Sequence, residues 1–170
     1  MFFLIILNGG AVISIKTGDF VHHPHHGIGK VKSIRKRSFS GDDRFAEIHF
    51  EADELKVMLP EDDLSETVRP PMRRKRAEKL LDHMRGWKGK VAASWKARAT
   101  RHQKKLDSGD PKEYAEVYKN LRTLRREGKL SVADRKHLQQ SLQFLSEELA
   151  IALDKTLPQA RGKIVEAARA

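Results

Sequence analysis

The chain has 170 residues, 39% of them hydrophobic and 34% charged, with a formal net charge of +11 and no cysteine. It is long enough for one domain or two small ones, and too apolar for a disordered chain. The absence of cysteine excludes disulfides, thiolate metal sites and cysteine nucleophiles, and it fits a cytoplasmic location.

Residues 1–14 begin with the apolar run Phe2–Leu7, which no basic residue precedes. The run is far shorter than the roughly 20 apolar residues that span a bilayer, and it lacks the basic start of a secretory signal. Two interpretations remain: an additional edge strand, or an extension from a misplaced start codon. We favour the extension, because strand-like sequence resumes at Ile13–Lys16, and we expect no membrane role.

Residues 15–69 have the pattern of short strands. The expected strands are the alternating runs at 30–39 and 44–51 and the segments 19–23 and 55–60. Turns rich in glycine, aspartate and proline separate them. This pattern is typical of a small antiparallel barrel or sheet, with a further strand within 61–69. The pair Pro70–Pro71 then marks a boundary.

Four histidines, His22, His23, His25 and His26, fall within one of these strands and its turn. Neighbouring residues of a strand point to opposite faces, so His22 and His23 do not converge. No second cluster with ligand spacing completes a metal shell. We therefore expect an ordinary strand and turn, with no metal site and no cofactor.

Residues 70–170 have the pattern of helices. The sequence predicts helices at about 71–86 and 94–106, one after a cap at Asp110, one after Ser131, and a short one after Pro158. Leucines at helical spacing along these segments are core positions. Scattered carboxylates and the lack of an identifiable triad predict that the chain is not an enzyme.

Positive charge is concentrated in this second part. Residues 1–69 hold nine basic and eleven acidic residues, whereas residues 73–105 hold thirteen basic and two acidic ones, a net charge of +11. Such a segment attracts polyanions through sequence-independent, salt-sensitive phosphate contacts. The alternative is a solvated basic face without a ligand.

Three segments of the chain carry a family resemblance: KTGDFVHHPHHGIGKVKSIRKR, VMLP and KKLDSGDPKEYAEVYKNLRTLRREGKLSVADRKHL. They resemble the CarD/CdnL family of bacterial RNA polymerase-binding regulators. The resemblance covers about residues 15–169. It implies an α+β protein: a small Tudor-like antiparallel β-barrel (15–69) that docks on the polymerase β subunit, as in transcription-repair coupling factors, followed by an all-helical DNA-binding domain (70–170). It also implies that the four histidines belong to a docking barrel.

The resemblance assigns the two family arginines that contact the β subunit to Arg37 and Met58. The methionine departs from the family pattern, and Lys56, on the same face of that strand, is its expected substitute. The tryptophan that the family wedges into the promoter minor groove, at the upstream edge of the bubble, falls on Trp95. Trp87 does not fit that register.

Without the family, Trp95 has two interpretations. It aligns with Ala99, His102 and Leu106 on a helical wheel, which favours a core position. An N-cap at Ser94 would instead place it in the first helical turn, where a side chain can project past the core. Bases that surround it are expected to contact phosphates: Lys96, Arg98, Arg101, Lys104 and Lys105.

These observations predict a transcription regulator, cytoplasmic and nucleoid-associated, that docks on polymerase and stabilises the promoter open complex. One alternative is a free-standing, non-specific nucleic-acid-binding protein that uses residues 73–105. A second is an interaction module whose helices recruit another protein.

Overall fold

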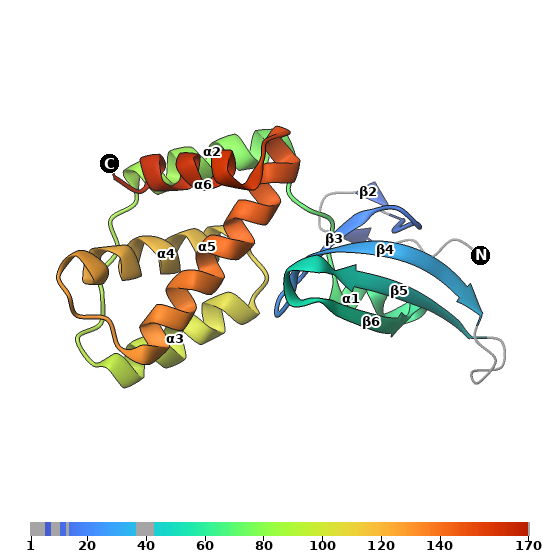
Figure 1. Cartoon of the computed structure of the whole chain (residues 1–170), viewed down its shortest axis with the longest axis horizontal. Coiled ribbons are helices and arrows are strands. Elements are labelled where there is room, and N and C mark those ends of the chain that lie inside the picture. Colours follow the sequence, from blue (N-terminus) through green and yellow to red (C-terminus); the bar gives the residue numbers. More distant parts are fainter. Residues whose placement is uncertain (1–5, 8–10, 13, 37–42, 170) are drawn as a thin grey trace. The chain divides into compact units, whose positions relative to one another are not determined.

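The computed structural model describes residues 6–7, 11–12, 14–36 and 43–169, which fall into two compact units that divide between Pro71 and Met72 (Figure 1). Each unit has its own apolar core, one beneath a β-sheet and one between helices. The protein is therefore α+β, as the sequence predicts.

The described strands of the first unit are β1 (Ile6–Leu7), β2 (Ala11–Val12), β3 (Phe20–His23), β4 (Gly27–Lys36), β5 (Arg44–Phe50) and β6 (Leu55–Pro60). β1 pairs with β2, and the other four strands form an antiparallel sheet in the order β3–β4–β5–β6. A short 3-10 turn, η1 (Glu51–Asp53), joins β5 to β6.

The alternation predicted from the sequence builds the core of this sheet. Ala46, Ile48 and Phe50 of β5 are fully buried on one face, together with Val21 and Val31. Position 29 of β4 requires glycine, because a Cβ there would lie only 2.6 Å from Cε1 of Phe50. A larger residue would collide with the ring that covers this strand.

The sheet differs from the prediction in two respects. Among the described residues it is open, with β6 at one edge and β3 at the other, where only a single bridge joins His22 to Arg69. The strand pattern predicted a small antiparallel barrel or sheet, and the family resemblance implied a Tudor-like barrel. Residues 61–67 form the 3-10 turn η2 (Glu61–Asp63) and the helix α1 (Leu64–Thr67) in place of the further strand predicted within 61–69. Of that range only Arg69 pairs with the sheet, through an isolated antiparallel bridge to His22 of β3. Leu64 and Val68, four residues apart, both bury their side chains in the sheet core, and this spacing favours a helical turn.

The helices of the second unit are α2 (Arg74–Gly86), α3 (Trp95–Asp107), α4 (Pro111–Arg126), α5 (Val132–Leu153) and α6 (Leu157–Ala167). Four of them begin at side-chain N-caps: Ser94, Asp110, Ser131 and Thr156. The first three are the predicted starts. The last helix begins one residue before Pro158, because Thr156 and Gln159 form a capping box around it.

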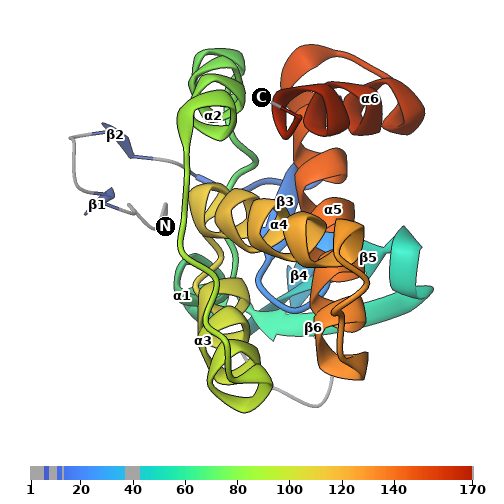
Figure 2. The ribbon, with the colours of Figure 1, turned by 90° about the vertical axis from the view of Figure 1, so that its left-hand side faces the viewer.

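The core of this unit forms where α4 packs on α5, α5 on α6, and α2 on α6. Figures 1 and 2 show α2 and α6 side by side. Glu148 of α5 is buried and accepts a hydrogen bond from the Met72 backbone N–H at 3.0 Å, which fixes the segment that leads into α2. No helix in the described part of the chain is long and apolar enough to cross a membrane.

Candidate nucleic-acid interface

Trp95 is the first residue of α3, and its side chain is 53% exposed. The Ser94 hydroxyl accepts a hydrogen bond from the Ala97 backbone N–H at 3.4 Å, which ends the loop and starts the helix at this point. The Lys96 ammonium lies 5.7 Å from the Trp95 ring centroid. The core interpretation of Trp95 is therefore wrong: the residue continues the buried stripe of α3 beyond the point where other helices cover it.

The buried face of α3 consists of Arg98, His102 and Leu106, spaced four residues apart. Burial lowers the pKa of His102 to about 4, helped by the neighbouring His137. His102 is therefore neutral at pH 7. It adds no positive charge to the helix surface.

Arg98 was expected to contact phosphate, and this expectation is wrong because the side chain is only 4% exposed. Its Nη2 and Nε donate to the two carboxylate oxygens of Asp134 at 2.6 and 2.9 Å. Its Nη1 donates to the carbonyl oxygens of Ala92 at 2.7 Å and Ala93 at 3.4 Å. Arg98 thus joins α3, the start of α5 and the loop before Trp95, and it is a positioning residue for that tryptophan.

Asp134 is fully buried in the first turn of α5. Burial alone would raise the pKa of its carboxyl group. Hydrogen bonds from Arg98, and from the Ser131 backbone and hydroxyl, outweigh burial and hold that pKa well below its usual range. The pair is therefore an ionised buried salt bridge with good geometry.

Lys105 also differs from the expectation. Its ammonium lies 2.6 Å from carboxylate oxygens of both Glu113 and Glu116 on α4. Burial would lower its pKa, but the hydrogen bonds to these two glutamates raise it. The charge of Lys105 is thus neutralised within the unit, and this side chain holds α3 against α4.

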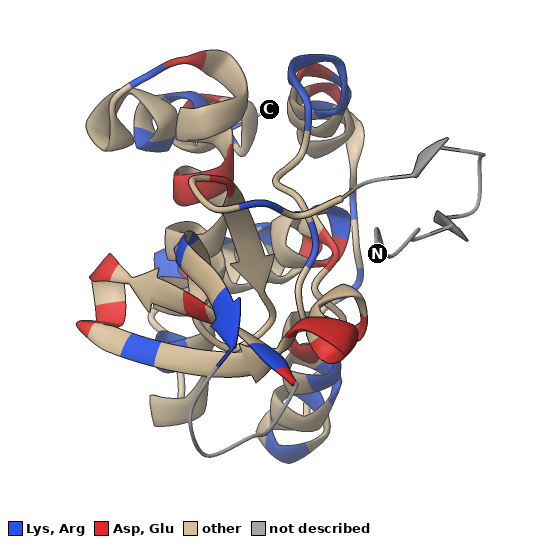
Figure 3. Cartoon of the chain, turned by 90° about the vertical axis from the view of Figure 1, so that its right-hand side faces the viewer, with Lys and Arg blue, Asp and Glu red and all other residues tan. Residues whose placement is uncertain are grey.

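The other three predicted phosphate contacts, Lys96, Arg101 and Lys104, are exposed on α3. Within the described ranges, none of the three forms an ion pair with a carboxylate. Further exposed bases lie on and just before α2 (Figure 3): Arg73, Arg74, Lys75, Arg76, Lys79 and Arg85. Two of these, Arg76 and Arg85, pair with Asp110 and Asp82.

Trp87, the second tryptophan, has a different environment. It is half-buried at the end of α2, and its ring lies so close to Gly89 that a Cβ on that glycine would be 1.9 Å from the indole. The ring centroid lies 6.5 Å from that of His83. Trp87 therefore packs on its own loop, whereas Trp95 presents its ring to solvent.

The predicted polymerase-binding residues lie on the first unit. Lys56 and Met58 are both exposed on the edge strand β6, and Met58 is 40% exposed. They pair in register with His49 and Glu47 of β5, whose side chains are hydrogen-bonded, with Nε2 of His49 2.6 Å from Oε1 of Glu47. Arg37 lies outside the described residues.

The four histidines are used within the first unit. His22 is fully buried, and burial together with Arg69 and His23 lowers its pKa to about 2. His23 Nδ1 accepts from the His25 backbone N–H at 3.1 Å, and His26 Nδ1 lies 3.1 Å from Asp53. The described residues contain no group of three or more potential ligands that could hold a metal ion.

Comparison with known proteins supplies the family. A match to the family described as "CarD, C-terminal domain" covers residues 79–165, and a match to the "CarD-like/TRCF RID domain" covers residues 15–72. The chain belongs to the CarD family. It is similar to the protein named "Putative transcription factor YdeB" of Bacillus subtilis (strain 168), at 25% identity over 138 residues that cover 80% of this chain and 90% of that protein.

Membership of the CarD family points to transcription regulation as the general role of this chain. The match over residues 15–72 indicates an interaction with RNA polymerase. The sequence correctly singled out the helix start at Ser94. It missed the two side chains on α3, Arg98 and Lys105, that the fold uses internally, because their partners lie on other helices.

Proposed function

We propose that this CarD family protein docks on the β subunit of bacterial RNA polymerase and stabilises the promoter open complex with Trp95. The observation that carries the proposal is the exposed indole at the first position of α3. A large apolar side chain that stays in solvent, on a helix held by a buried salt bridge, is available for a partner surface. The protein would act in the cytoplasm, at the nucleoid.

On the DNA side, Trp95 enters the minor groove at the upstream edge of the transcription bubble. Apolar wedges flanked by basic residues kink and unstack duplex DNA in this way. Lys96, Arg101 and Lys104 contact phosphates and supply affinity without reading sequence. Arg98 keeps the loop before Trp95 in place through the Ala92 and Ala93 carbonyl groups.

On the polymerase side, the outer face of β6 contacts the β subunit through Lys56 and Met58, and Arg37 adds the contact that the family resemblance assigns to it. An edge strand offers unpaired backbone groups and side chains of one face to a partner. Met58 replaces the family arginine, so this contact is apolar here. Docking would locate Trp95 at the promoter by raising its effective concentration there.

The size of the effect follows from stacking. Base–aromatic stacking contributes about 1–3 kcal/mol per base, and about 1.4 kcal/mol changes an equilibrium tenfold. One wedge would therefore shift the equilibrium towards the open complex by about 5- to 150-fold.

The test is the lifetime of the open complex on a weak promoter with the cognate polymerase. Wild type should prolong the lifetime, and Trp95→Ala should not, although it folds and binds polymerase. Leu157→Ala is a matched control, because Leu157 is also an exposed apolar residue at the first position of a helix. If Trp95→Ala prolongs the lifetime as well as wild type does, Trp95 is not a wedge, and the helices serve as an interaction module.

A second candidate function is a free-standing, non-specific nucleic-acid-binding protein, favoured by the net charge of +11 in residues 73–105. It predicts no capture of polymerase by residues 1–69. Docking predicts capture that weakens with Lys56→Glu. A mixture of residues 1–71 and 72–170 should leave the open complex unchanged under our proposal, because neither unit alone supplies both docking and the wedge.

A further inference from the structure

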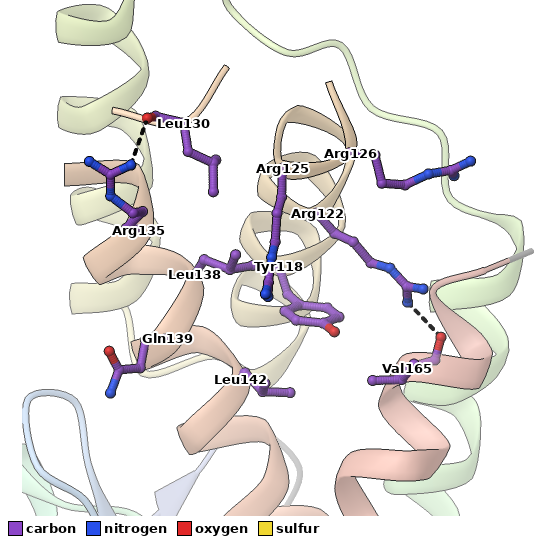
Figure 4. A pocket seen from close by; sticks show the side chains of 10 residues that line it. All are labelled: Tyr118, Arg122, Arg125, Arg126, Leu130, Arg135, Leu138, Gln139, Leu142 and Val165. Atoms are coloured by element: carbon purple, nitrogen blue, oxygen red, sulfur yellow. Dashed lines mark hydrogen bonds between the residues drawn. The ribbon is translucent and has the colours of Figure 1, made fainter. Parts of the chain in front are cut away.

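A pocket of about 770 Å³ lies between α4, α5 and α6 of the helical unit (Figure 4). Four arginines line it: Arg122, Arg125, Arg126 and Arg135. None of its lining residues is acidic. Neither Trp95 nor any of the α3 bases contributes to it, so the proposed DNA contacts leave the pocket unused.

The guanidinium groups of this pocket lack the carboxylate partners that neutralise other bases of the unit. Arg76, Arg85 and Lys129 each form an ion pair with an aspartate or glutamate. Over the described part of the chain, the four pocket arginines form no such pair. A concave site with four unneutralised charges favours a bound anion.

Two of the arginines are held in place by backbone carbonyl groups. Arg122 Nη1 donates to the Val165 carbonyl oxygen on α6 at 2.6 Å, and Arg122 also hydrogen-bonds the Tyr118 side chain. Arg135 Nη1 donates to the Leu130 carbonyl oxygen at 3.5 Å. Figure 4 shows these two contacts on opposite sides of the pocket, with Arg125 between them. Each guanidinium retains further N–H donors for a ligand.

Helix stability explains only part of this cluster. Arg125 and Arg126 lie in the last turn of α4, where cations interact favourably with the helix dipole. Arg135 lies near the start of α5, where the same dipole disfavours a cation, and Arg122 lies a turn before the end of α4. These two positions gain nothing from the dipole, yet both residues line the pocket.

The base of the pocket is apolar. Tyr118 and Leu138 are almost fully buried, and Leu142 and Val165 are half-buried beside them. The volume falls in the range of about 300–1,000 Å³ typical of small-molecule sites, which combine apolar walls with a few placed polar groups. A nucleic-acid backbone requires the charges but not this apolar cavity.

We propose that the pocket binds a small amphipathic organic anion, with a phosphate or carboxylate group on the arginines and an apolar body on Tyr118, Leu138 and Leu142. Arg125 and Arg135 hold the anionic group. Arg122 is engaged with both the Val165 carbonyl oxygen and Tyr118, whereas Arg135 donates one hydrogen bond at 3.5 Å to the Leu130 carbonyl oxygen and keeps its other N–H groups for the ligand. The ligand bridges α4 and α5 near their connecting loop.

The test uses the full-length protein and octyl phosphate, with binding followed by calorimetry and by backbone amide NMR shifts. Octyl phosphate should shift the amides around the pocket, and Arg125→Gln/Arg135→Gln should weaken binding by at least about tenfold, equivalent to about 1.4 kcal/mol. Lys112→Gln/Arg161→Gln removes the same charge from exposed sites outside the pocket and should bind as wild type does.

Three comparison ligands separate the sources of affinity. Inorganic phosphate should bind much more weakly than octyl phosphate, octanoate should shift the same amides, and octyltrimethylammonium should shift none of them. The proposal is overturned if octyl phosphate does not bind, if the cationic amphiphile binds equally well, or if the control variant loses as much affinity as the pocket variant. It is also overturned if duplex DNA, and not the amphiphile, shifts the pocket amides, because the arginines then belong to a nucleic-acid surface.

Discussion

Replacing Arg98 by methionine should destabilise the helical unit far more than replacing any exposed base of α3. The change removes the guanidinium and leaves the Asp134 carboxylate fully buried, with hydrogen bonds from Ser131 but no counter-charge. Breaking a buried ion pair by removing one partner costs about 3–5 kcal/mol. Arg101→Met is the matched control: the same substitution at an exposed position of the same helix, with an expected effect within about 0.5 kcal/mol.

The assay is urea unfolding followed by far-UV circular dichroism, which reports the helices. Asp134→Asn and the double variant complete a mutant cycle. We expect the double variant to be more stable than the sum of the single losses predicts, by about 1–3 kcal/mol, because the two side chains share one interaction. Equal losses for Arg98→Met and Arg101→Met, or additive losses in the cycle, would refute the assignment of Arg98 as an internal tie.

The pH dependence of the free energy of unfolding tests the same Arg98–Asp134 pair. The folded-state pKa of Asp134 lies below its unfolded value of about 4, so the ionised carboxylate stabilises wild type above that pH, and this stability is lost as the pH falls further. Without Arg98, the guanidinium no longer holds the pKa of the Asp134 carboxyl group down. The stability difference between wild type and Arg98→Met should therefore shrink below about pH 4.

Three further predictions follow from the described contacts. Lys104→Gln should reduce the magnitude of the slope of log affinity for duplex DNA against log salt concentration by about 0.9, as expected for the loss of one phosphate contact. Lys105→Gln should leave that slope unchanged and should reduce thermal stability, because Lys105 pairs with Glu113 and Glu116 of α4. His22 has a pKa of about 2 in the folded protein, so below about pH 6.5 the unfolded chain binds a proton that the folded chain does not. The free energy of unfolding of the sheet unit should therefore fall by about 2 kcal/mol between pH 7 and 5. Chemical denaturation should show a flatter pH profile for His22→Gln. Gly29→Ala should destabilise the sheet by about 1–3 kcal/mol through overpacking against Phe50, and an unchanged urea midpoint would contradict the close approach of that ring.

The sequence by itself determined the order and type of most elements, because these depend on local signals. Alternation predicts β4 and β5, and the caps Ser94, Asp110 and Ser131 predict three helix starts. The same local reasoning predicted a further strand within 61–69, where η2 and α1 form instead and only Arg69 pairs with β3. It placed Trp95 in the first turn of its helix but did not decide whether the indole was buried.

Only the tertiary structure decided which charges face solvent. Arg98 and Arg101 are neighbours on one helical segment, and the sequence does not show that the carboxylate of Asp134, 36 residues away, pairs with Arg98. Burial of a charge depends on whether a partner from another helix arrives with matching geometry. For the same reason the arginine pocket is a property of three packed helices: Arg122 and Arg135 converge because α4, α5 and α6 meet, not because of their spacing in the chain.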